Sequence, residues 1–208
     1  MALMNSITAI GCVVVQYFVN GLGVIYSSAY SACSKYINIF MLPGLTAGHS
    51  MAAFTGQNFG AGRIDRIKEG IGVCIKISLI AYALLGAVMV LFPESLALLM
   101  LNSEDTISLA AEFLPICGIM LFAVDLLFVF RNCVQGMGKP MLPMLSGILE
   151  MILRIAVIIL FISSMGFTAT AIAEAAAWTG ALILNMTAYF INIRKFSHTT
   201  IGEACVKY

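Results

Sequence analysis

Residues 54–70, FTGQNFGAGRIDRIKEG, decide how the rest of the chain is read, because this stretch is polar while both of its flanks are strongly apolar. Glycines beside basic residues are typical of phosphate-binding loops, but such a loop needs a lysine followed by serine or threonine. Here an arginine stands at that position, and no strand precedes the stretch. The stretch therefore predicts a polar turn between two hydrophobic helices and argues against a nucleotide site.

The composition of the whole chain predicts a membrane protein. Of its 208 residues, 61% are hydrophobic and 10% are charged, whereas soluble domains carry about 25% charged residues. A soluble protein this apolar could not cover its surface with polar side chains. The net charge of +1 gives no basic surface for nucleic acid. The six cysteines lack metal-ligand spacing, so we expect small packing residues and no cofactor.

Six segments are apolar over roughly the 20 residues that a membrane-spanning helix needs. We predict an all-α membrane protein with a six-helix transmembrane bundle over residues 1–195 and a short cytoplasmic tail over residues 196–208. The second segment is long, and Pro43 with Gly44 and Gly48 is expected to kink it. The predicted spans are residues 2–20, 30–58, 71–92, 111–135, 141–163 and 169–193.

Basic residues outside the spans fall in every second loop, which predicts the orientation of the chain. The loops in between carry neither lysine nor arginine. Because basic loops stay on the cytoplasmic side, we expect a multi-pass protein of the cell (plasma) membrane with a cytoplasmic C-terminus. The basic residues concerned are Arg63, Arg66, Lys68, Lys139, Arg194 and Lys195.

Ionisable side chains inside the spans are costly unless they have partners or face a watery cavity. Glu150 and Arg154 stand four residues apart, hence on one helical face. They predict a structural ion pair, or alternatively a pair that lines a cavity and moves during transport. Asp125 predicts either a hydrogen bond to Arg131 or Arg154, or a protonatable, cation-binding carboxylate. Glu174 lies deep enough in the sixth span to face the bundle.

A polar stripe follows one face of the first span. Its members are three or four residues apart, so they point the same way. Such a row of amides suits a helix that lines a cavity, and it equally suits a packing face where amides cross-link helices. Asn132, seven residues after Asp125, adds an amide on nearly the same face of the fourth span. The candidate cavity-lining residues are therefore Asn5, Gln16, Asn20 and Asn132.

Small residues recur every four positions in two spans, which predicts close helix packing. The pairs Gly44 with Gly48 and Gly56 with Gly60 do so in the second span. The sixth span repeats this spacing at Ala169, Ala173, Ala177 and Ala181.

Catalytic motifs are missing from the sequence. It contains no HExxH, GxSxG or phosphate-loop pattern. His49 beside Ser50 has no matching partner motif, so we do not expect an enzyme.

Two blocks of sequence resemble the multidrug and toxic compound extrusion (MATE) transporters. GQNFGAGRIDRIKEG, residues 56–70, is similar to the family pattern G-Q-N-x-G-A-G followed by a charged run. RNCVQGMGKPMLPMLSGILEMILRI, residues 131–155, is similar to R-x-x-L-Q-G-x-G followed by E-x-x-x-R. The first block is expected to form a cytoplasmic elbow, in which the side chains of Gln57 and Asn58 satisfy loose backbone groups. The elbow motif comprises Gly56, Gln57, Asn58, Gly60, Gly62 and Arg63.

The resemblance implies a function as well as a fold. MATE proteins have two six-helix lobes around a central cavity, and they exchange cationic or amphipathic compounds for Na⁺ or H⁺ by rocking of the lobes. This chain resembles the C-terminal lobe only, which implies multidrug or xenobiotic efflux with the N-terminal lobe or a second copy as partner. In one branch of the family, acids on the first and fourth helices of this lobe hold the cation. The first span here has no acid, so Asp125 is the candidate cation-coupling residue.

Two other functions are compatible with the sequence. A lipid-linked saccharide or polysaccharide flippase of the same superfamily would need a cationic cavity to meet pyrophosphate headgroups. A truncated membrane fragment that does not transport would need no cavity chemistry at all.

Overall fold

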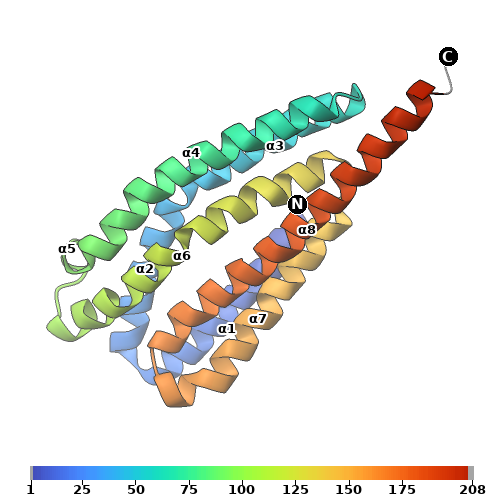
Figure 1. Ribbon diagram of the computed structural model, residues 1–208. Coiled ribbons are helices and arrows are strands. Elements are labelled where there is room, and N and C mark those ends of the chain that lie inside the picture. The colour runs from blue at the N-terminus through green and yellow to red at the C-terminus, as the bar shows by residue number, and fades with distance from the viewer. Residues whose placement is uncertain (1, 206–208) are drawn as a thin grey trace.

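The computed structural model describes residues 2–205, and it places the side chains of residues 6–196. This part of the chain forms a bundle of helices and contains no strand (Figure 1). The helices are α1 (Ala2–Leu22), α2 (Val24–Phe40), α3 (Leu42–Gly60), α4 (Ile64–Leu91), α5 (Pro93–Leu98), α6 (Glu104–Gly136), α7 (Met141–Met165) and α8 (Thr168–Cys205).

Four of these helices are long and apolar enough to cross a membrane, judged by length and composition. They are α4, α6, α7 and the Thr168–Phe196 part of α8. The first predicted span corresponds to α1, which is apolar but shorter over its Ser6–Leu22 part. The second predicted span corresponds to α2 and α3 together. The all-helical membrane architecture expected from the sequence is thus confirmed.

The second predicted span differs in detail from the structure. Residues 30–58 were expected to form one kinked helix, but α2 and α3 are separate helices that meet at Met41. The break has the expected cause, because Pro43 stands in the first turn of α3, where its missing N–H does no harm. In addition, α2 begins six residues early, directly after Gly23, whose φ of 124° suits glycine. The predicted loop between the first two spans is therefore a single-residue joint.

If α2 and α3 are taken as one pass, the long helices run alternately from one end of the bundle to the other (Figure 1). The α3–α4 turn, the α6–α7 turn and the C-terminal end of α8 lie at one end, and the α1–α2, α4–α6 and α7–α8 connections lie at the other. The basic loop residues therefore share one end of the molecule. At the centre is α6, which packs against α2, α3, α4, α5, α7 and α8.

Small residues form the closest helix contacts, as predicted. Ala169, Ala173, Ala177 and Ala181 are completely buried, and α8 packs against both α6 and α7. On α3, a Cβ added at Gly48 would stand 2.7 Å from the Phe128 carbonyl oxygen of α6. The second predicted pair of small residues differs, because a Cβ at Gly60 would meet nothing within 4 Å.

Residues 61–63 form the tight turn that the sequence predicts, and the rest of the 54–70 stretch belongs to the end of α3 and the start of α4. The N–H groups of Ala61, Gly62 and Arg63 donate to the last carbonyls of α3, with N–O distances of 3.2, 3.1 and 2.8 Å. Asn58 differs from expectation, because its side-chain amide donates to Phe54 O inside the helix, at 2.8 Å. Backbone groups, rather than the Asn58 side chain, therefore close the end of the helix.

Gly62 provides the left-handed residue of this turn, with a φ of 67°. We expect Gly62→Ala to lower the free energy of unfolding by about 1 kcal/mol, because an L-residue is strained in this conformation. Gly72→Ala inside α4 is the matched control, since neither glycine has an atom within 4 Å of an added Cβ. The control should raise the free energy of unfolding by up to about 1 kcal/mol. Denaturant titration in detergent measures both, and equal effects of the two substitutions would contradict this explanation of the turn.

Candidate functional site

A groove of about 700 Å³ enters the bundle and is lined by residues of α1, α2, α3, α6, α7 and α8. This volume lies in the range of about 300–1,000 Å³ that is typical of small-molecule sites. Exposed side chains, including Asn38 and His49, stand at its rim. At its base lie polar and charged side chains that line the groove and are otherwise almost completely buried. These residues, here called the groove floor, are Arg131, Asn132, Glu150, Arg154 and Glu174.

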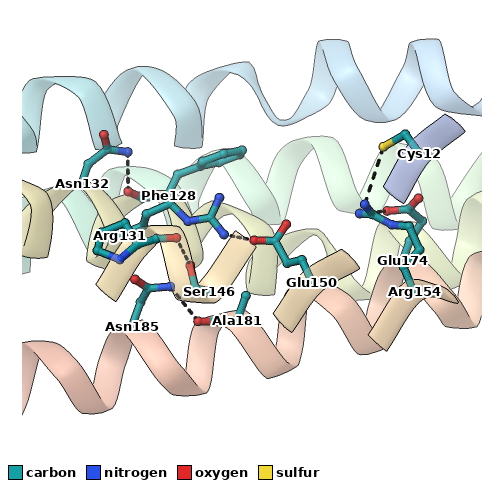
Figure 2. A network of polar contacts seen from close by, with 11 residues as sticks. Cys12, Phe128, Arg131, Asn132, Ser146, Glu150, Arg154, Glu174, Ala181 and Asn185 are labelled. Carbon is teal, nitrogen blue, oxygen red and sulfur yellow. Dashed lines mark hydrogen bonds and ion pairs between the residues drawn. The ribbon is translucent and has the colours of Figure 1, made fainter. Parts of the chain in front are cut away.

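Two ion pairs organise the groove floor (Figure 2). Arg131 of α6 pairs with Glu150 of α7. Arg154 of α7 pairs with Glu174 of α8, with 2.7 Å between Nη2 and Oε2. None of the four side chains is more than 9% exposed. The pairs therefore join the three helices that carry the floor, and each buried charge has an opposite charge in contact.

The predicted ion pair between Glu150 and Arg154 is wrong. The spacing does place both residues on one face of α7, but that face lies between α6 and α8, and each charge pairs with a neighbouring helix. Both residues line the groove, which is where the alternative, cavity-lining interpretation places them. Glu174 faces the bundle as expected.

The two ion pairs differ in how completely they are hydrogen-bonded. The Arg154–Glu174 pair has further partners: Arg154 Nη1 lies 3.6 Å from Cys12 Sγ, and the Tyr30 hydroxyl lies 3.4 Å from Glu174 Oε1. Nε of both arginines has no hydrogen-bond partner among the described residues, and neither has Asn132 Oδ1. The difference between the pairs therefore lies in the contacts that Cys12 and Tyr30 add to Arg154 and Glu174.

The predicted polar stripe of α1 is divided between two roles. Gln16 and Asn132 line the groove, as do Thr8 and Cys12. Asn20 does not line it, because Asn20 Oδ1 accepts hydrogen bonds from Gln16 and from Ser27 of α2, both at 2.7 Å. Amides at the end of α1 therefore cross-link two helices, which is the other interpretation that the sequence left open.

The structure does not test the prediction for Asn5, and it differs from the prediction for Cys12. The side chain of Asn5 lies outside the residues whose side chains the structure places. Cys12 was expected to be a packing residue, but it is exposed at the groove.

Asp125 lies outside the groove floor. It is 1% exposed, and it faces the start of α3, where a Cβ at Gly44 would collide with its carboxylate. Neither carboxylate oxygen has a hydrogen-bond partner among the described residues. The predicted hydrogen bond to Arg131 or Arg154 is therefore wrong, because both arginines pair with glutamates. A buried carboxyl group without a donor is a candidate for proton or cation binding.

The elbow residues, Gly56 to Arg63, do not line the groove. They lie at the end of α3 and connect it to α4. Their part in the molecule is that of a turn, as the sequence predicts.

Comparison with known families identifies the chain. Residues 1–160 match the family described as MatE. The chain belongs to the MatE family. This is a family of membrane transporters and not of enzymes, in agreement with the prediction from the sequence. No curated protein matches the chain.

Solved MATE structures share this fold. A MATE protein in the straight conformation matches with a TM-score of 0.87 and 14% identity, over 94% of this chain and 45% of its own length. The Vibrio cholerae MATE transporter VcmN in the bent form gives 0.85 and 17%, over 93% and 44%. A MOP superfamily transporter from Pyrococcus furiosus gives 0.83 and 15%, over 94% and 46%. At these identities the likeness concerns the fold, and the chain spans about half the length of these transporters.

Sequence reasoning missed several residues of the groove in this MatE protein. Tyr30 and Trp178 line it although both are largely buried. Trp178 follows Glu174 by four residues, so helical spacing could have placed both on one face. No such signal exists for the pairing of Arg131 with Glu150, because it joins two helices across a turn.

Proposed function

We propose that this chain is the C-terminal lobe of a two-lobed MATE transporter that exports drug-like or other xenobiotic compounds in exchange for Na⁺ or H⁺. The observation that carries the proposal is the groove, whose volume of about 700 Å³ suits a drug-sized compound. Its floor brings ionised side chains deep into an apolar bundle, where such residues mark substrate and ion pathways. Membership of the MatE family supports the same function.

The second lobe is the N-terminal half of the transporter or a second copy of this chain. In transporters built from two repeats, substrate binds where the repeats meet, and one repeat rocks against the other. The end of the bundle that carries the basic turns and the C-terminus faces the cytoplasm of a plasma-membrane protein, because Arg63, Arg66, Lys139 and the other basic loop residues gather there.

Cationic or amphipathic compounds fit this groove better than polyanions do. Both arginines of the floor have a glutamate partner, so the floor offers no excess positive charge to a pyrophosphate headgroup. This disfavours the flippase alternative. A lipid-flipping assay beside a dye-efflux assay distinguishes the two functions. If the protein shows neither activity, the chain is a membrane fragment that does not transport.

Asp125 is the proposed cation-coupling residue. In the two-lobed transporter, we expect Asp125→Asn to reduce ion-driven efflux of ethidium at least about tenfold, because the amide cannot take up or release the coupling ion, and tenfold corresponds to about 1.4 kcal/mol. The measurement is dye efflux from membrane vesicles on imposing an Na⁺ or H⁺ gradient.

Glu112→Gln serves as the matched control, because Glu112 is an exposed acid on the same helix. It should leave efflux within about twofold of the unsubstituted protein. Undiminished efflux in Asp125→Asn would refute the coupling role and leave the transport proposal standing. Absence of gradient-driven efflux in the unsubstituted protein would refute transport itself.

A further inference from the structure

We propose that His49 is a proton-responsive residue of the groove, and that its protonation weakens the binding of cationic compounds there. The inference rests on the proposed function, because it takes the groove as the place where such compounds bind. Three observations carry it: the position of His49, its lack of a partner among the described residues, and the balance of the other charges around the groove.

His49 stands on the part of α3 that faces the groove. It lines the groove together with Leu45, one turn earlier on the same helix, and its side chain is exposed. The preceding residue packs on α6, because a Cβ added at Gly48 would stand 2.8 Å from Asn132 Nδ2. His49 precedes Gly60, the last residue of α3, by roughly 16 Å along the helix, and the hydrocarbon core of a bilayer is about 30 Å thick. His49 therefore lies near the middle of the membrane.

The other titratable side chains of the groove all have partners. Both arginines pair with glutamates, and the Cys12 thiol and the Tyr30 hydroxyl contact the second of these pairs. His49, by contrast, makes no hydrogen bond or ion pair with any residue that the structure describes. An exposed imidazole in this situation exchanges protons with the water of the groove. Ionisable residues that face a watery cavity at membrane depth mark ion and proton pathways.

The protonation of His49 changes the charge of the groove as a whole. The two closed ion pairs contribute no net charge, and histidine is the side chain whose charge ordinarily changes between about pH 5 and 8. The described lining therefore has no net charge when His49 is neutral and one positive charge when it is protonated. Like charges in a partly apolar site repel each other more strongly than in water, so proton binding to His49 and cation binding to the groove oppose each other.

Two further titratable groups face α3 from neighbouring helices. Asp125 of α6 faces the start of α3 at Gly44, and Cys74 Sγ of α4 lies 3.7 Å from the Ala47 carbonyl oxygen. Neither of them lines the groove. Because Asp125 is the proposed site of the coupling ion, the experiment has to separate it from His49. The titratable residues that line the groove beside His49 are Cys12, Tyr30, Arg131, Glu150, Arg154 and Glu174.

This opposition between proton and cation gives the exchange cycle a direction. When the groove opens to the more acidic side of the membrane, His49 takes up a proton and the cationic compound is released. On the less acidic side the proton leaves and the next compound binds. The effect of His49 comes in addition to the ion bound at Asp125.

Two compounds that share three phenyl groups on phosphorus test the charge dependence. Methyltriphenylphosphonium is a permanent cation, and triphenylphosphine oxide is uncharged. Isothermal titration calorimetry measures the Kd of each compound on the two-lobed protein in phosphatidylcholine nanodiscs, with empty nanodiscs subtracted. The protein carries Asp125→Asn, so that this carboxyl group takes up no proton. Between about pH 8 and about pH 5.5, the Kd of the cation should rise at least about threefold, whereas that of the uncharged compound should change less than about twofold.

Variants with a fixed charge at His49 should have a fixed affinity for the cation. His49→Gln is neutral and should bind the cation at both pH values as the parent does at the higher pH. His49→Lys is positively charged and should bind it weakly at both. Ser50→Gln is the matched control, because Ser50 is the exposed neighbour on α3 but does not line the groove. A purely structural role of His49 would not make one variant resemble the neutral protein and the other the protonated protein.

Chemical modification of the unsubstituted two-lobed protein gives an independent measurement. Diethyl pyrocarbonate transfers a carbethoxy group to a neutral imidazole nitrogen with release of ethanol and CO₂, so the rate follows the unprotonated fraction of His49. Mass spectrometry of the His49 peptide measures this rate. A saturating concentration of methyltriphenylphosphonium should slow it at least about threefold at the higher pH, because the cation occupies the groove beside His49.

Three results would each overturn the proposal: equal pH dependence for both compounds, a pH dependence that survives His49→Gln, or modification of His49 that the cation does not slow. The measurements use no ion gradient, so their failure differs from failure of the proposed function. Binding that weakens with protonation of His49, without gradient-driven efflux, would uphold this inference and refute transport. Gradient-driven efflux with pH-independent binding would refute this inference alone.

Discussion

Glu174→Gln is expected to lower the free energy of unfolding by about 3–5 kcal/mol, the usual cost of removing one partner from a buried ion pair. The substitution keeps the size of the side chain but leaves Arg154 with no charged partner, and Arg154 is only 2% exposed. Its other contact, the Cys12 thiol at 3.6 Å, is a weak acceptor that cannot replace a carboxylate. Denaturant titration of the protein in detergent measures the change.

A double variant distinguishes an unpaired charge from a general loss of packing. Arg154→Met with Glu174→Leu removes both charges and keeps similar volumes, so it should recover most of the stability that Glu174→Gln loses. The exposed acid Glu112 supplies the control, because Glu112→Gln should change the free energy of unfolding by less than about 0.5 kcal/mol. A double variant less stable than Glu174→Gln would show that the pair contributes more than charge neutrality.

Gly48→Ala should cost about 1–3 kcal/mol, although it adds only one methyl group. The new Cβ would stand 2.7 Å from Phe128 O and 2.9 Å from Phe128 C, which are backbone atoms of α6 and cannot rotate away. The two helices would have to move apart, which would also loosen the neighbouring contact between Gly44 and Asp125. The same denaturant titration measures this change.

Gly60→Ala is the matched control on the same helix, because its added Cβ would meet nothing within 4 Å. It should change the free energy of unfolding by less than about 0.5 kcal/mol. If both glycines tolerate alanine equally well, close contact between α3 and α6 does not contribute to stability.

The fold could be predicted from sequence wherever a local signal was sufficient. Apolar runs gave the long helices, and the glycines and charges of residues 54–70 gave the turn after α3. The position of Pro43 predicted a disturbance of the second span, but not that α2 would begin directly after Gly23. A single glycine can make a complete joint between two helices, and nothing in the apolar pattern distinguishes such a joint from a longer loop.

The candidate site was predicted in its residues more than in its contacts. Glu150, Arg154, Gln16 and Asn132 do line the groove, because buried polar residues in an apolar chain are informative by themselves. Spacing along one helix could not show that α7 lies between an arginine of α6 and a glutamate of α8. Partners on other helices depend on tertiary packing, which a single sequence does not contain.

The single-residue joints at Gly23 and Met41 have a consequence for the shape of the groove. They divide the wall formed by α1, α2 and α3 into three separate helices, whereas the paired charges lie on α6, α7 and α8. Two helices that meet at a short joint can change the angle between their axes without unwinding. Because Cys12 of α1 and Tyr30 of α2 contact the Arg154–Glu174 pair, a change of angle at either joint would alter the surroundings of that pair, whereas the Arg131–Glu150 pair joins only α6 and α7.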